Sequence, residues 1–122
     1  MPEYWFDHIH LRSPNPVKTA EFYEQMFGAK RVSLRGGGNR RPAMTKLDLN
    51  GITILISQAE EGIQTGLVHF GIRTDKLNEA VKTMKGKGVE FTQDIREVQP
   101  DFKISFLKAP EDVSIELQEG SL

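Results

Sequence analysis

The sequence predicts an α+β fold: two tandem βαβββ modules forming one cupped, mostly antiparallel mixed sheet with helices on its outer face. The first observation is the order of the expected elements. In each half, stretches that alternate polar and apolar residues surround one amphipathic stretch. The second is a spacing of 61 residues, which relates His8 to His69 and residues 52–57 to 113–118. The third is length, since 122 residues fit a single domain, with modules at about 4–60 and 66–119.

The first module begins with FDHIHLRS, whose alternation predicts a strand. A helix over 16–27 should follow, because Asn15 can cap it, Pro16 suits its first turn and Gly28 suits its exit. A flexible loop, GGGNRRP, comes later, and Asn50-Gly51 is a strong hairpin-turn signal. The strands expected in this module are residues 6–13, 30–35, 43–49 and 52–57.

The second module repeats this order without a linker. GLVHFGIRT reads as its first strand, and DKLNEAVKTMKGKG reads as an amphipathic helix over 75–88 that Asp75 caps. The strands expected in this module are residues 66–74, 88–93, 103–108 and 113–119.

Side-chain alternation assigns two faces to the strands that carry the repeat. The apolar face of each strand should pack beneath the helix of its module. The other faces should line a shared concavity, where histidines and a carboxylate are costly to bury without partners. A metal ion would satisfy the His and Glu groups together. The side chains expected there are His8, His10, Arg12, His69, Arg73 and Glu116.

Composition excludes several other classes of protein. The formal net charge of −1, without a basic stripe, argues against a nucleic-acid partner. The chain has no cysteine, which excludes disulfides, a thiol nucleophile and a Cys-ligated zinc site. No apolar run approaches the roughly 20 residues of a membrane span, so no membrane partner is expected. The opening residues lack the regions of a signal peptide, so a cytoplasmic location is expected.

Three segments, taken in order and at this spacing, carry a family resemblance. They are DHIHLRSPNPVKTAEFYEQMFGAK, HFGIRTDKLNEAVKTMKGKGVEF and ISFLKAPEDVSIELQE. With them the chain resembles, over nearly its whole length, the vicinal oxygen chelate superfamily. That superfamily contains glyoxalase I, methylmalonyl-CoA epimerase, extradiol dioxygenases and the fosfomycin- and bleomycin-resistance proteins.

The resemblance implies a single glyoxalase-like domain with one divalent metal ion in its cup. The implied ligands are His8, which follows Asp7 directly, then His69 and Glu116. The remaining ligand position falls on Leu55, which cannot bind metal, whereas glyoxalase I has a carboxylate there. Two His and one carboxylate suit Zn, Ni, Co, Mn or Fe(II) alike, so the identity of the metal stays open.

The resemblance also implies an activity. The chain is expected to be a metal-dependent lyase or isomerase that acts on a small carbonyl or carboxylate substrate through an enediolate held on the metal. A non-haem Fe(II) dioxygenase is an alternative, since the three ligands match that facial set. A metal-free module that binds an antibiotic or another small molecule is a second alternative. A homodimer is expected in each case.

Five further residues have candidate roles around the cup. His10 is either an acid or base in catalysis, a partner of the ligands, or a histidine hydrogen-bonded to the fold. Arg12 and Arg73 are symmetric positions near the rim that could bind an anionic substrate. Arg40 and Arg41 in the Gly-rich loop could do the same, and a solvated surface is the alternative for all of these arginines.

Overall fold

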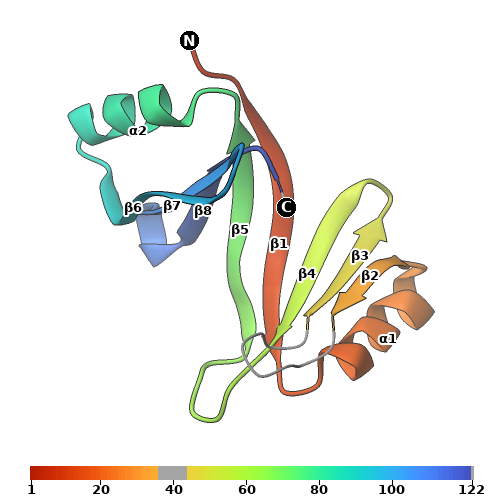
Figure 1. Ribbon diagram of the computed structural model, residues 1–122. Coiled ribbons are helices and arrows are strands. Elements are labelled where there is room, and N and C mark those ends of the chain that lie inside the picture. Colours follow the sequence, from red (N-terminus) through yellow and green to blue (C-terminus); the bar gives the residue numbers. More distant parts are fainter. Residues whose placement is uncertain (36–43, 122) are drawn as a thin grey trace. The chain divides into compact units, whose positions relative to one another are not determined.

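The computed structural model describes residues 1–35 and 44–121, and it confirms the α+β fold with two βαβββ modules (Figure 1). The loop predicted over 36–42, which contains Arg40 and Arg41, lies outside the described residues. In chain order the elements are β1 (Tyr4–Ser13), α1 (Pro16–Phe27), β2 (Lys30–Arg35), β3 (Met44–Leu49), β4 (Ile52–Gln58), β5 (Gly66–Thr74), α2 (Leu77–Gly86), β6 (Glu90–Gln99), β7 (Phe102–Lys108), a short 3-10 turn η1 (Pro110–Asp112) and β8 (Ser114–Glu119).

The strands form a mixed sheet in the order β2-β3-β4-β1-β5-β8-β7-β6. β1 pairs with β4 in parallel, and β5 pairs with β8 in parallel, while the hairpin neighbours are antiparallel. The chain folds as two compact units: a first unit of residues 8–68, and a second unit of residues 69–122 together with 1–7.

The two units repeat the same strand register. In the first unit Ile9 is the partner of Ile54, and in the second Phe70 is the partner of Ile115. Ile9 lies 61 positions before Phe70, and Ile54 lies 61 positions before Ile115. The spacing found in the sequence thus also relates the strand pairings of the two units. Equivalent residues of the two units therefore sit at equivalent places on their strands.

The core of the first unit lies between α1 and the strands β2, β3 and β4, as Figure 1 shows. Ala20 of α1 is fully buried against Leu47, Ile54 and Ile56, and the ring of Tyr23 packs against the same cluster. Alternate residues of β4 thus point at the helix, which confirms the predicted apolar face of this strand.

The ends of α1 follow the sequence signals. Asn15 Oδ1 accepts a hydrogen bond from the Lys18 amide at 3.1 Å, which satisfies one of the free donors at the helix start. Gly28 has a φ of 74°, a left-handed conformation that glycine adopts without strain, and its amide bonds to the Glu24 carbonyl at 3.1 Å. Residues 50–51 also form the predicted turn, with φ values of 48° and 93°.

The core of the second unit lies beneath α2. Leu77, Ala80 and Val81 of this helix are buried with Leu107 and Leu117 from the strands. The packing there is incomplete, because a partly open cavity of about 280 Å³ remains among apolar side chains. Its lining includes Met84, the equivalent of Tyr23 in the first unit.

The cap of α2 differs from the prediction. Asp75 was expected to cap this helix, but the first turn receives its carboxylate from β8, where Glu119 Oε1 accepts from the Leu77 amide at 2.8 Å. Asp75 Oδ1 instead accepts from the Glu3 amide at 2.9 Å. The prediction was wrong because a carboxylate 42 residues away reaches the helix start. A negative charge at that end is also favoured by the helix dipole.

The first residues of β1 pack with the second unit. The ring of Phe6 stacks on Phe70 with centroids 5.8 Å apart. The guanidinium of Arg73 lies 5.5 Å from the ring centroid of Trp5, a cation–π contact. These contacts explain why residues 1–7 belong with residues 69–122.

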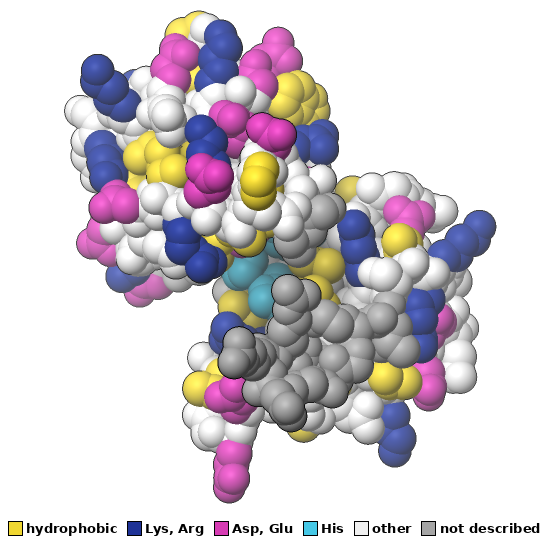
Figure 2. All heavy atoms as spheres, viewed as in Figure 1, with side chains coloured by type: hydrophobic (Ala, Val, Ile, Leu, Met, Phe, Trp, Pro, Cys, Tyr) yellow, Lys and Arg dark blue, Asp and Glu magenta, His cyan; other side chains and the backbone are white. Residues whose placement is uncertain are grey.

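The described surface is mixed in charge. Figure 2 shows Lys and Arg side chains interspersed with Asp and Glu over the described part of the visible face. α1 has 12 residues and α2 has 10, so neither described helix approaches the length and apolar character that a membrane-spanning helix needs.

Candidate metal centre

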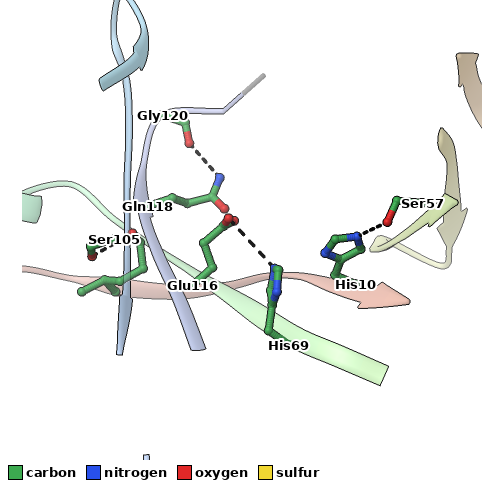
Figure 3. A network of polar contacts seen from close by, with 8 residues as sticks. His10, Ser57, His69, Ser105, Glu116, Gln118 and Gly120 are labelled. Carbon is green, nitrogen blue, oxygen red and sulfur yellow. Dashed lines mark hydrogen bonds and ion pairs between the residues drawn. The ribbon is translucent and has the colours of Figure 1, made fainter. Parts of the chain in front are cut away.

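The second unit brings a histidine and a carboxylate together. His69 on β5 is 8% exposed and the Glu116 side chain on β8 is 13% exposed, with Nε2 and Oε2 4.0 Å apart (Figure 3). This separation is too long for a hydrogen bond. It fits two ligands of one ion, because two atoms each about 2.1 Å from a metal are at most about 4.2 Å apart.

The fold fixes both side chains on the face away from α2. Ile115 and Leu117 of β8 pack in the cluster beneath α2, so Glu116 between them points to the opposite face. The ring of Phe106 on β7 meets the His69 ring edge to face, with centroids 5.2 Å apart. This contact limits the orientations that the imidazole can adopt.

Gln118 is a residue of this face to which the sequence analysis gave no role. It follows Glu116 by two positions on β8, and its side chain is 3% exposed. Its Nε2 donates to the Gly120 carbonyl at 3.0 Å, whereas its Oε1 is buried without a hydrogen-bond partner. The alternation that identified Glu116 could also have identified Gln118, since both occupy the polar face.

The first unit contributes His8, which is 3% exposed on β1. In the parallel pair its partner on β4 is Thr53. Its equivalent in the second unit is His69, so each unit holds one buried histidine at the same place on its first strand.

His10 lies two residues along β1 and is half-buried. Its Nε2 is 2.7 Å from Ser57 Oγ on β4, a contact drawn in Figure 3. Burial first, and then the charges of Arg12 and His8, lower the pKa of His10 to about 4. The imidazole is therefore neutral at pH 7, because desolvation disfavours its charged form.

Leu55 is the register partner of His10 and lies on the face opposite the core. Ile54 and Ile56 on either side of it pack in the core of the first unit, while Leu55 is half-buried and outside that cluster. The predicted face of this position is thus confirmed. A leucine offers no ligand atom, so the first unit has no carboxylate equivalent to Glu116.

The two rim arginines occupy equivalent registers, Arg12 beside Ser57 and Arg73 beside Gln118. Arg12 is half-buried, and Arg73 is exposed with its guanidinium over the ring of Trp5. Their role toward an anionic substrate stays a prediction.

Within the second unit His69 and Glu116 each offer one ligand atom that could hold a metal ion, and their side chains are buried and half-buried. His8, at the equivalent position of the first unit, is a further buried histidine that offers one ligand atom. Two imidazole nitrogens and one carboxylate oxygen suit a first-row divalent ion such as zinc, iron or nickel. The residues thus fit the metal that the resemblance implies.

The cavity of the second unit is not part of this set. It lies on the helix-covered face, lined by apolar residues such as Ile72, Ile115 and Leu117, whereas Glu116 points to the other face. A pocket without convergent polar groups offers little to orient a reacting substrate. The metal-binding side chains therefore define the candidate centre.

Comparison with known proteins identifies the family of the chain. Residues 5–117 match the family model described as the glyoxalase/bleomycin resistance protein/dioxygenase superfamily. None of the curated protein sequences matches the chain.

Similar folds occur among solved structures. A hypothetical protein from Bacillus halodurans aligns with a TM-score of 0.80 at 16% identity, covering 98% of this chain and 96% of that one. Methylmalonyl-CoA epimerase from Mycobacterium tuberculosis aligns with a TM-score of 0.75 at 18% identity, covering 96% and 88%. A Streptomyces coelicolor methylmalonyl-CoA epimerase variant in complex with 2-nitronate-propionyl-CoA aligns with a TM-score of 0.68 at 19% identity, covering 96% and 97%. At these identities the likeness establishes the fold alone.

Proposed function

Because the chain belongs to the glyoxalase/bleomycin resistance protein/dioxygenase superfamily, we propose that it is a metal-dependent lyase or isomerase acting on a small carbonyl or carboxylate compound. The observation that carries the proposal is the His69–Glu116 pair, buried and half-buried on one face with ligand atoms 4.0 Å apart. An imidazole nitrogen and a carboxylate oxygen at this separation are ligand atoms that first-row divalent ions accept.

We propose that His8 of the first unit completes the donor set, which leaves further coordination positions open for substrate. A divalent ion held there would act as a Lewis acid that stabilises negative charge on a carbonyl oxygen after loss of a neighbouring proton. Two neutral imidazoles and one carboxylate around such an ion give a local charge of about +1. Together with Arg12 and Arg73, that charge supports an anionic substrate.

His10 fits a positioning role better than that of the base. Its pKa of about 4 makes it a weak proton acceptor at neutral pH. Its bond to Ser57 fixes the ring, so its other nitrogen has a defined direction. We propose that His10 orients a polar group of the substrate, and that another group removes the proton. A homodimer, with the donor set within one chain or shared between two copies, remains part of the proposal.

The first experiment is the metal content of protein purified without chelator or nickel resin, measured by mass spectrometry. We expect near-stoichiometric metal in the wild type and a large loss in Glu116→Ala. The matched control is Glu97→Ala, which removes an exposed carboxylate from β6 of the same unit and should keep the metal. Equal metal content in both variants, or none in the wild type, would contradict the proposal.

The reaction class is then tested by proton exchange. The metal-loaded protein is incubated in deuterated water with small carbonyl and carboxylate compounds, methylmalonyl-CoA among them, because epimerases share the fold. Exchange of a hydrogen next to a carbonyl would support the lyase or isomerase assignment. Oxygen uptake with Fe(II) would instead assign a dioxygenase, for which the two-histidine, one-carboxylate set is the supporting observation. Tight ligand binding without metal would assign a binding module.

A further inference from the structure

The amide oxygen of Gln118 is buried without a hydrogen-bond partner. A buried polar atom left without a partner costs about 1–3 kcal/mol. Such atoms are rare in folded proteins and call for an explanation. Gln118 lies on the same strand and the same face as Glu116, and in Figure 3 both side chains extend from β8 toward the same side.

The orientation of this amide is fixed by the end of the chain. Gln118 Nε2 donates to the Gly120 carbonyl at 3.0 Å, so a flipped amide would set two oxygens against each other. Gly120 is itself held in place: its φ is 81°, and a Cβ there would collide with the carbonyl of Asp101. The Asp101 carbonyl therefore leaves no room for a side chain at residue 120. Because Nε2 of Gln118 is bonded to the Gly120 carbonyl, its Oε1 points away from that carbonyl.

Comparison of the units shows why this oxygen lacks a partner. Its equivalent in the first unit is Ser57, whose hydroxyl is paired with His10. The equivalent of His10 in the second unit is Gly71, which has no side chain to pair with Gln118. The neighbour of Gln118 in register on β7 is Ile104, which offers no side-chain donor, and its neighbour on β5 is Arg73, whose guanidinium lies over the ring of Trp5.

We propose that Gln118 Oε1 is a ligand of the same divalent ion as His69 and Glu116. The proposal rests on the metal centre assigned above. An amide oxygen and a carboxylate on one face of a strand repel each other, and a cation between them converts the repulsion into attraction. Carbonyl oxygens are accepted metal ligands. The Nε2 bond to Gly120 is the kind of outer contact that orients a ligand before the metal arrives.

Gln118 thereby supplies an oxygen that the first unit lacks. Leu55, the equivalent of Glu116, offers no ligand atom, so among the described residues of the first unit the proposed set draws on His8. The second unit then supplies three donors, His69, Glu116 and Gln118, and the ion would be held chiefly by that unit.

The test is Co²⁺ titration of the metal-free full-length protein, followed by calorimetry and by the visible spectrum of the bound ion. Gln118→Met keeps the size of the side chain and removes the oxygen. We expect its Kd for Co²⁺ to rise about tenfold or more, the range over which partners of a metal ligand act, and its spectrum to change. Metal-free Gln118→Met should melt close to the wild type, because losing the buried unpaired acceptor offsets losing the Nε2 bond to Gly120.

The matched control is Gln93→Met on β6. Gln93 is also half-buried with an unpaired amide atom, but that atom is a nitrogen, which cannot coordinate. In the sheet Gln93 is the register partner of Phe106, which separates it from Glu116. The Kd and the spectrum of Gln93→Met should equal those of the wild type.

A crystal structure of the Co²⁺-loaded wild type decides the matter without a variant. An Oε1–metal distance within about 2.6 Å supports the assignment, and a distance beyond direct coordination overturns it. A wild-type Kd and spectrum in Gln118→Met would also overturn it, while leaving the metal centre intact. If the wild type binds no Co²⁺, both the proposed metal centre and the proposed Gln118 ligand are contradicted.

Discussion

The two units use one strand arrangement for two different polar environments. In the first unit the polar face carries His10, Leu55 and Ser57, and the histidine and serine are bonded to each other. In the second unit the same three places carry Gly71, Glu116 and Gln118, and the glutamine oxygen has no hydrogen-bond partner. At these three places the first unit pairs its serine hydroxyl with its histidine, whereas the second leaves the amide oxygen of Gln118 without a hydrogen-bond partner.

The cores differ in the same direction. Tyr23 packs with the buried cluster of the first unit, while its equivalent Met84 borders a cavity of about 280 Å³ in the second. The unit that carries His69 and Glu116 thus also carries this cavity, on its helix-covered face. Duplication of a module leaves each copy free to take a different share of stability and chemistry.

The largest expected effect is on the free energy of unfolding, when equivalent residues of the two cores are shortened. Ile56 and Leu117 are equivalent, have 0% and 1% exposure, and are isomers of equal size. Each change to Ala should lower the free energy of unfolding by about 2–5 kcal/mol. Ile56→Ala should cost more, because Leu117 already borders the cavity, where part of its surface has no packed neighbour to lose. Urea denaturation of both variants measures the difference, and equal losses would refute unequal packing.

The next largest effect is expected on metal affinity, from a substitution that removes a chemical difference between the units. Leu55→Glu gives the first unit the carboxylate that the second has at Glu116. If both positions face one ion, affinity for Zn²⁺ should rise about tenfold to a hundredfold, as for other partners in metal sites. Competition with a chromophoric chelator measures this, with Leu55→Met as the control of similar size. No change in Leu55→Glu would mean that Leu55 does not face the ion.

A smaller effect separates a local helix cap from a distant one. Asn15→Ala should destabilise the protein by about 1 kcal/mol, the usual value for a lost cap. Glu119→Ala should cost as much or more, about 1–2 kcal/mol, because its bond to the Leu77 amide is charge-assisted. Asp75→Ala should cost less than either, since Asp75 does not cap α2. Thermal unfolding ranks the three variants. A loss of stability in Asp75→Ala larger than in Glu119→Ala would mean that Asp75 caps α2 after all.

The smallest effect concerns an ion pair in each unit. Arg31 and Glu24 pair at 2.7 Å with side chains 29% and 27% exposed, while Lys85 and Asp94 pair with side chains 48% and 77% exposed. Glu24→Gln should cost up to about 1 kcal/mol, and Asp94→Asn should cost close to nothing, because water screens the more exposed pair. The same denaturation measurement in low and high salt tests this ranking.

Much of the fold could be predicted from local pattern. Alternation located the strands, and Asn15, Pro16 and Gly28 marked the ends of α1 because capping depends on neighbouring residues. The spacing between His8 and His69 identified two equivalent histidines, since a duplicated module repeats its positions.

Features that depend on packing could not be read from the sequence. Glu119 bonds to an amide of α2 that lies 42 residues earlier in the chain, and no residue pattern near Asp75 predicts this bond. The unpaired oxygen of Gln118 depends on where Gly120 directs its carbonyl. The lowered pKa of His10 depends on burial and on its neighbours in the fold, which composition does not reveal.

The bond between Glu119 and α2 also has a consequence for the order of events during synthesis. α1 can be capped as soon as Asn15 and Lys18 have left the ribosome, because both belong to one turn of chain. α2 emerges with its first amides unsatisfied and acquires its carboxylate only when β8 has been made. A nascent chain that stops before Glu119 should thus hold α1 formed and α2 frayed, a difference that hydrogen exchange on stalled chains would record.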